Sequence, residues 1–145
     1  MAVMLRPVFT TFLAIFALSV EAQEVRDCAG LEPVAVMRAP DLTFGEGAVR
    51  LWRVETETGV TLAVFFPGAT AAGPAICRVV GLGADDGFLD IEIAEVDARY
   101  DAETGLALEF AVVVDDSGEP LVDRGMLRVV IDRAQGRVMA ETWGG

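Results

Sequence analysis

Two cysteines, Cys28 and Cys77, are the residues best suited to covalent chemistry, and they are the only cysteines in this chain of 145 residues. Their spacing is not the CxxC of redox enzymes, and the chain has no histidine that could complete a zinc site. In an exported protein such a pair most simply forms a structural disulfide, which here would remove roughly 4 kcal/mol of denatured-state entropy. We therefore predict a Cys28–Cys77 disulfide, and a catalytic or metal-binding pair is the alternative.

Carboxylates are the second group that could do chemistry, because 23 acidic residues stand against 11 basic ones and give a net charge of −12. On one predicted hairpin, Asp97 would lie opposite Glu109, with Glu95 and Arg99 beside them. Like charges placed opposite each other destabilise a strand pair by up to about 1 kcal/mol. A bound Ca²⁺ would remove this repulsion, and so would Arg99 bridging the two acids, so both explanations stay open.

The chain lacks the side chains on which most catalytic sites depend. It has no histidine and no lysine, and Ser117 is the only serine after residue 22. Nucleophilic catalysis needs a hydroxyl or thiol beside a proton acceptor, which is normally histidine or lysine. We therefore predict no catalytic residues and no cofactor, with calcium as the one metal to consider. A hydrolase that uses two carboxylates is the catalytic alternative, although no acid pair stands out from the others.

The segment Asp115–Glu119 has a superficial likeness to a calcium-binding loop. It lacks the twelve-residue frame and the terminal glutamate of an EF-hand. Aspartate, serine and glycine are also the residues that tight turns favour, so we predict a simple loop here.

The first 22 residues have the pattern of a cleavable signal peptide. Arg6 supplies a positive charge, an apolar run extends from Pro7 to Val20, and Ala22 precedes the expected cleavage site. The run is shorter than the roughly 20 residues of a membrane-spanning helix. We predict a mature chain that starts at Gln23 and resides in the bacterial periplasm or outside the cell, and an uncleaved interfacial anchor is the alternative.

After residue 22, alternating apolar and polar residues are interrupted by glycine, proline or aspartate every ten residues or so, which is typical of antiparallel strands. A turn pattern that ends in glycine occurs at 55–59, 101–105 and 132–136 and predicts three hairpins with three-residue loops. The predicted strands span 48–55, 60–66, 75–81, 88–100, 105–114, 122–132 and 136–143, with a further short one at 33–38. Residues 23–145 would thus form one all-β domain of seven or eight strands, either an antiparallel sandwich or a small barrel.

The turns also predict how the strands pair. The second hairpin would place apolar residues opposite one another, in the pairs Tyr100–Leu106, Ala98–Leu108 and Val96–Phe110. A shift in the apolar phase earlier on the same strand predicts one extra residue, a β-bulge, near Ala94 or Glu95. The third hairpin would set Ile131 opposite Arg137, which leaves its inner face unassigned.

The outer face of the first hairpin is the candidate binding surface. The predicted register pairs Trp52 with Leu62 and Val54 with Val60 on the inner face. The outer face would then combine apolar area with one cation. Its residues are Val49, Leu51, Arg53, Ala63 and Phe65. If these side chains are exposed, they form a partner-binding patch, and if another sheet covers them, they are core.

Together these expectations favour an exported, non-catalytic binding domain, such as an inhibitor or an accessory subunit of the cell envelope. Its expected partner is another envelope or secreted protein, because a net charge of −12 repels nucleic acid and anionic lipid. No segment after residue 22 predicts stable membrane insertion. The first alternative is a small-ligand carrier, which requires a barrel with an unfilled interior, and the others are a calcium-dependent module and the acid-pair hydrolase.

Overall fold

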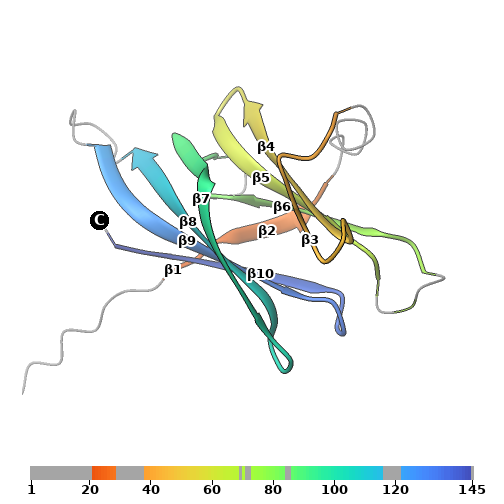
Figure 1. Ribbon diagram of the computed structural model, residues 1–145. Helices are drawn as coiled ribbons and strands as arrows, with labels where there is room; N and C mark the ends of the chain where they lie inside the picture. Colours follow the sequence, from red (N-terminus) through yellow and green to blue (C-terminus); the bar gives the residue numbers. More distant parts are fainter. Residues whose placement is uncertain are drawn as a thin grey trace, which may run out of the picture.

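The computed structural model describes residues 21–28, 38–68, 70, 73–83, 86–115 and 122–144. Within these ranges all regular structure is β, and every strand pairing is antiparallel. The strands form two separate five-stranded sheets that pack face to face, so the domain is a sandwich and not a closed barrel (Figure 1). This confirms the predicted all-β class and agrees with the sandwich among the two predicted architectures. None of these residues forms a helix that is long and apolar enough to cross a bilayer.

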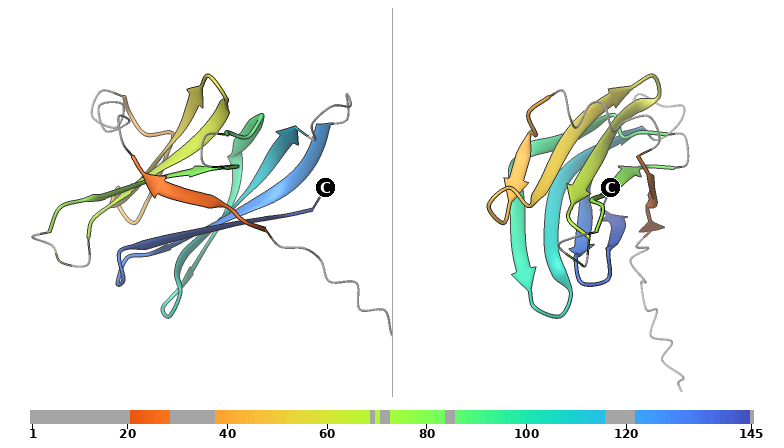
Figure 2. Two further views of the ribbon diagram at one scale, coloured as in Figure 1. Left: turned by 180° about the vertical axis from the view of Figure 1, so that it is seen from behind. Right: turned by 90° about the vertical axis from the view of Figure 1, so that its right-hand side faces the viewer.

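Each sheet combines an N-terminal edge strand with four later strands. The first sheet has the order β1 (Glu21–Ala22), β10 (Arg137–Trp143), β9 (Val122–Asp132), β8 (Gly105–Asp115) and β7 (Asp90–Asp101). The second has the order β2 (Glu24–Asp27), β6 (Ile76–Gly81), β5 (Gly59–Phe66), β4 (Val49–Thr56) and β3 (Leu42–Phe44). Only Gln23 separates β1 from β2, so both N-terminal edges lie on one side of the sandwich and β3 and β7 lie on the other (Figure 2).

The core lies between the two sheets and is filled by large side chains. Phe66, Phe88 and Phe110 have no exposed surface, and they belong to one cluster with the inward residues of both sheets. Burial of such a side chain contributes about 1.5–3 kcal/mol. The interior therefore holds packed side chains where a ligand-carrying barrel would hold a cavity.

The second hairpin has the predicted pairing at its tip and a larger bulge than predicted. Tyr100 pairs with Leu106 and Ala98 with Leu108, as expected. The register then shifts, because four residues of β7, 93–96, lie between Glu92 and Asp97 while one residue of β8, Phe110, lies opposite them. The bulge is where the sequence predicts it, but it holds three extra residues instead of one, so the predicted Val96–Phe110 pair does not form.

The first hairpin pairs one residue away from the predicted register. Trp52 lies opposite Ala63 and not Leu62, because the loop has two residues and Thr56 pairs with Gly59. The hydroxyl of Thr56 donates to the carbonyl oxygen of Gly59 at 3.0 Å and closes this tight turn. A one-residue slip exchanges the two faces of a strand, so this error changes which side chains are buried.

The third hairpin also differs from its predicted register by one residue. Arg137 lies opposite Asp132, and Val138 lies opposite Ile131. The loop has four residues because the carboxylate of Asp132 accepts the N–H of Gln135 at 3.1 Å and stabilises a longer turn. Ile131 and Val138 are both buried, which assigns the inner face of this hairpin.

The seven long strands follow the predicted ranges within two residues, while β1, β2 and β3 are additional. These three have two, four and three residues, too few for alternation to reveal them. The described residues therefore contain ten strands, more than the seven or eight predicted. Most of the predicted signal peptide, the predicted short strand at 33–38 except Arg38, and the loop after Asp115 lie outside the described residues.

The predicted disulfide is present. The sulfur atoms of Cys28 and Cys77 are 1.99 Å apart, and Cys28 is 1 % exposed. The bond joins the end of β2 to β6 within the second sheet, where Asp27 pairs with Arg78. It therefore fixes the N-terminal segment to the body of the domain, as the cysteine spacing predicts.

Candidate functional site

A cleft of about 480 Å³ opens at the end of the sandwich where three hairpins meet. Tyr100 and Leu106 come from the hairpin of β7 and β8, Phe44 and Val49 from the hairpin of β3 and β4, and Ile131 from β9. The first two hairpins belong to different sheets, so the cleft lies between the layers at their open end. Figure 1 shows these turns at the lower end of the molecule.

The cleft combines apolar walls with charged groups at its margin. Glu103, Asp132 and Arg133 are the charged residues that line it. Asp132 is 7 % exposed, and its carboxylate is held by the N–H of Gln135 and by Arg137 at 3.6 Å. The remaining lining is mainly aromatic, aliphatic or glycine, which is the composition of a site that takes an apolar group and orients it by few polar contacts.

Tyr100 is the most exposed large apolar residue among those the structure describes, with 78 % of its surface accessible. The turn that follows it is rigid, because the carboxylate of Asp101 accepts the N–H groups of Glu103 at 2.7 Å and Thr104 at 2.9 Å. The hydrogen bond from the N–H of Thr104, and next in size the one from the N–H of Glu103, hold the pKa of Asp101 below its usual value. A fixed turn therefore presents an exposed aromatic ring at the mouth of the cleft.

The predicted metal ligands are only partly brought together. Asp97 lies directly opposite Glu109, as expected, while Glu95 lies in the bulge. The two acids bind different arginines, since Arg99 contacts Asp97 at 2.8 Å and Arg128 contacts Glu109 at 2.7 Å. A single bridging Arg99 is therefore not what offsets the repulsion.

The first sheet's outer surface continues this charged row. Arg128 also contacts Glu141 at 3.3 Å and stacks over the ring of Trp143 at 5.3 Å. Over the described ranges, no three acidic or cysteine side chains form a group that could hold a metal ion. Calcium binding at Glu95, Asp97 and Glu109 stays a prediction.

The predicted partner-binding face of the first hairpin does not form one surface. Val49 and Leu51 are buried in the main core, whereas Phe65 and Ala63 lie on the opposite face of the sheet. The one-residue error in register explains the mixture. Val49 and Leu51 are therefore core residues, and Arg53 forms ion pairs with Glu55 and Asp90.

The opposite face of this hairpin carries an aromatic cluster that is largely covered. Trp52 is 1 % exposed and its ring N–H donates to the carbonyl oxygen of Arg38 at 3.0 Å. Phe65 meets Trp52 edge to face, and the guanidinium of Arg50 lies 4.9 Å from the Phe65 ring. These contacts indicate that this face is packed against Arg38 and Arg50 and is not an open binding patch.

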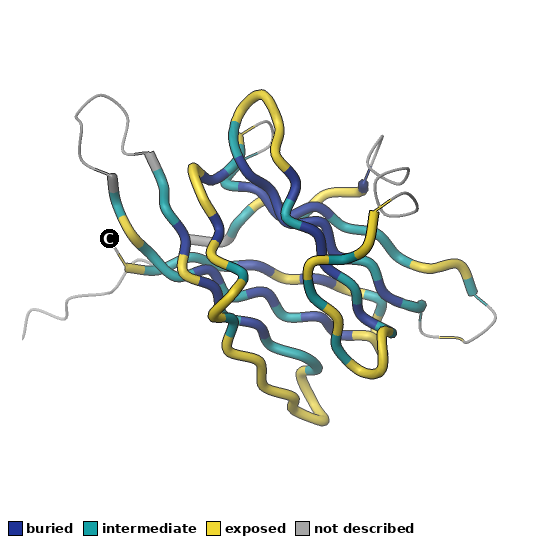
Figure 3. Tube along the Cα trace, turned by 45° about the horizontal axis from the view of Figure 1, so that its top comes forward, coloured by how far each residue is buried: buried dark blue, intermediate teal, exposed yellow. Residues whose placement is uncertain are grey.

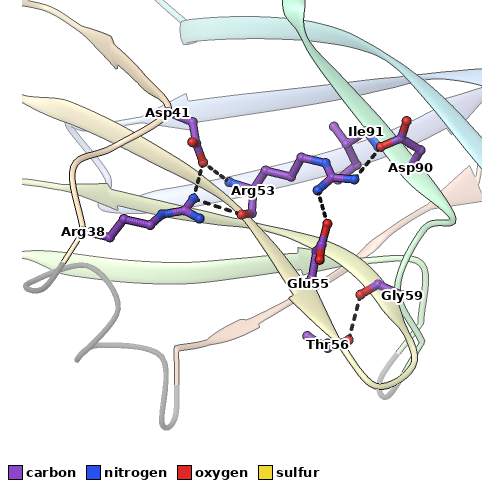
Figure 4. Close-up of polar contacts among 8 residues, drawn as sticks. All are labelled: Arg38, Asp41, Arg53, Glu55, Thr56, Gly59, Asp90 and Ile91. Atoms are coloured by element: carbon purple, nitrogen blue, oxygen red, sulfur yellow. Dashed lines mark hydrogen bonds and ion pairs between the residues drawn. The ribbon is translucent and has the colours of Figure 1, made fainter.

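Arg53 joins the two sheets through the contacts that Figure 4 draws. Its partner Asp90 is the first residue of β7, whose other end carries Tyr100 at the cleft. The guanidinium of Arg53 contacts Glu55 at 2.8 Å on its own strand and Asp90 at 2.7 Å on β7 of the other sheet. Hydrogen bonds to Glu55 and then Asp90 raise the pKa of Arg53, and Arg53 lowers the pKa of Asp90. A general acid needs a raised carboxyl pKa, so the shift at Asp90 is opposite to the one that this role requires.

The cleft is the site that sequence reasoning missed. Its lining comes from segments up to 90 residues apart in the sequence, between Phe44 and Ala134. No local sequence pattern predicts that these segments lie together. One signal was present, because Tyr100 is an aromatic residue next to a hairpin turn, where solvent exposure is expected. Comparison of the chain with protein-family models, curated proteins and solved structures finds no match.

Proposed function

We propose that this protein is an exported, non-catalytic binding domain whose cleft receives an apolar side chain of another protein. The observation that carries the proposal is the pairing of a cleft of about 480 Å³ with Tyr100, which is 78 % exposed at its mouth. Exposed aromatic residues beside a pocket are the usual anchors of protein interfaces. The absence of histidine and lysine from the chain supports a binding role over catalysis.

Export to the periplasm or the cell exterior is part of this proposal. The Cys28–Cys77 disulfide supports it, because such bonds persist in oxidising compartments and are rare in the cytosol. The apolar N-terminal run supports it from the sequence side. Glu21 and Ala22 pair with β10, so cleavage after Ala22 would remove β1 and leave Gln23 at the edge of the first sheet.

Capture from an envelope extract of the source cell tests the proposal. Tagged parent protein should retain a partner in near-stoichiometric amount, and Tyr100→Ser should lose at least nine tenths of it. Met139→Ser is the matched control, because Met139 is also an exposed apolar residue but lies on β10 away from the cleft lining. Equal capture by parent and Tyr100→Ser would show that the cleft is not the binding site.

A small apolar ligand is the second candidate occupant. The volume of the cleft lies within the roughly 300–1,000 Å³ of small-molecule sites, and this observation favours it. A thermal-shift screen of apolar and amphipathic compounds tests this candidate. A compound that raises the melting temperature of the parent but not of a Leu106→Ser variant would support it, because Leu106 lines the cleft and is only partly buried.

A further inference from the structure

Among the described strands, β7 has one unpaired edge, and its residue Tyr100 lines the cleft. β7 is the last strand of the first sheet and pairs only with β8 among the described strands. Beyond the bulge, residues 97–101 are all exposed, and Figure 3 shows this hairpin extending away from the buried body of the sandwich. An unpaired strand edge offers a row of N–H and C=O groups to another extended chain.

The side chains of β7 determine which chain it can accept. Its sequence, DIEIAEVDARYD, has five acids and one arginine. Arg53 contacts Asp90, at the end away from the cleft, and Arg99 contacts Asp97 at 2.8 Å. The side chain of Asp97 is still about half exposed, and Asp101 is exposed next to the cleft. Because opposite charges across a strand pair stabilise it and like charges destabilise it, this edge favours a basic strand.

The same charges disfavour a second copy of this protein. Pairing two β7 edges would bring together two strands that each carry five acids and only one arginine, in molecules that each carry a net charge of −12. Natural edge strands use charge in this way to prevent association with themselves. A partner of opposite charge is the occupant that these residues allow.

We propose that β7 binds an extended, basic segment of a partner protein by strand addition, with an apolar side chain of that segment entering the cleft beside Tyr100. Tyr100 belongs to the exposed half of β7 and also lines the cleft. A single bound strand would therefore contact the β7 edge and the cleft together. Alternating residues of that strand would point to the two faces of the sheet. Its cations would then lie on the face opposite to Tyr100, where they would contact Asp101 and compete with Arg99 for Asp97. This inference rests on the proposed function of the cleft.

The probe is a fluorescein-labelled peptide of nine residues in which lysine alternates with valine, and fluorescence anisotropy measures its affinity for the full domain. Two matched peptides serve as controls. One carries glutamate in place of lysine, and the other keeps lysine but has every backbone nitrogen methylated. The parent protein should bind the lysine peptide at least tenfold more tightly than either control.

Two protein variants test the edge itself. Successive N–H groups of a strand point to opposite neighbours, so one of Ala98→Pro and Arg99→Pro removes an edge donor and the other breaks the pairing with β8. The variant that keeps the parent melting temperature should bind the lysine peptide at least tenfold more weakly. Should neither variant fold, the methylated peptide still provides the test.

Each contrary outcome has a distinct meaning. Equal binding of the methylated and unmethylated lysine peptides overturns strand addition and leaves the cleft intact as a binding site. A parent that forms dimers which the folded proline variant abolishes assigns the edge to a second copy and overturns the inference. Failure of the proposed function itself is a separate result, in which Tyr100→Ser captures the same partner as the parent.

Discussion

Tyr100 and Phe110 point to the same face of the hairpin of β7 and β8, yet Tyr100 is 78 % exposed and Phe110 is fully buried. The hairpin extends past the core, so the sequence pattern identified the face correctly but could not show where the opposite sheet ends. Alternation reports which side of a strand a residue occupies. It does not report what covers that side.

This difference gives a prediction for two single substitutions. Phe110→Ala should lower the free energy of unfolding by about 3–5 kcal/mol, because it leaves a cavity in the core. Tyr100→Ala should change the free energy of unfolding by less than about 0.5 kcal/mol, as exposed sites do. Urea unfolding followed by circular dichroism measures both. Similar losses for the two variants would contradict the burial described for this hairpin.

The Arg53–Asp90 contact gives a prediction about pH. Asp90 is charged in both the folded and the unfolded state above its ordinary pKa, so the contact contributes its full stability there. Because Arg53 lowers the folded pKa of Asp90, this contribution is lost as pH falls from the ordinary aspartate range through the lowered value. The side chain of Asp90 is 53 % exposed, which limits the contribution to less than about 1 kcal/mol.

Asp90→Asn should therefore be less stable than the parent at pH 7, and the gap should narrow as the pH falls below 4. Unfolding in urea at a series of pH values measures the gap. Asp123→Asn is a suitable control, because no ion pair involving Asp123 is found among the described residues. A gap that stays constant with pH would show that the contact does not link the two sheets energetically.

At the scale of elements, the positions of the strands were predictable and their registers were less so. Seven long strands follow from alternation and turn residues, and the second hairpin pairs as predicted at its tip. The first hairpin was misjudged because β4 is apolar on both faces, with Leu51 buried inside and Trp52 buried outside. Where both faces are apolar, the pattern does not distinguish two registers that differ by one residue.

Substitutions at two glycines distinguish the cost of backbone strain from the cost of steric overlap. Gly47 and Gly105 both have a positive φ, of 83° and 97°, but a Cβ at Gly47 would meet nothing within 4 Å while one at Gly105 would lie 2.3 Å from the carbonyl oxygen of Ile131. Gly47→Ala should cost about 1–2 kcal/mol from strain alone. Gly105→Ala should cost at least about 1 kcal/mol more, because β8 and β9 must separate. Thermal unfolding of both variants measures this, and equal costs would argue against the close approach of these strands.

At the scale of the molecule, the disulfide and the cleft show what the sequence could and could not reveal. Two cysteines in a chain with export features leave one pairing, so Cys28–Cys77 was predictable. The cleft depends on how far two sheets extend past a shared core, and on three turns that are distant in sequence. Such a site is set by tertiary packing, which no local pattern encodes.

Removal of the disulfide tests its contribution to the whole domain. The double variant Cys28→Ser with Cys77→Ser should lose about 2–5 kcal/mol of stability, because the bond closes a loop with a sequence separation of 49 residues. Guanidinium unfolding measures the loss, and the parent with reductant is the control. A double variant as stable as the oxidised parent would mean that the N-terminal segment is held by its β2–β6 pairing alone.

The most direct test of the central claim uses the fact that Tyr100 is the only tyrosine in the chain. Protein produced with 3-fluorotyrosine carries one fluorine at the mouth of the cleft, and ¹⁹F NMR observes it alone in an envelope extract. If a partner binds in the cleft, this signal shifts or broadens in the extract, and it does not do so in extract first depleted over immobilised parent protein. An unchanged signal in an extract from which the same protein captures a stoichiometric partner would contradict the account, because the partner would then bind away from the cleft.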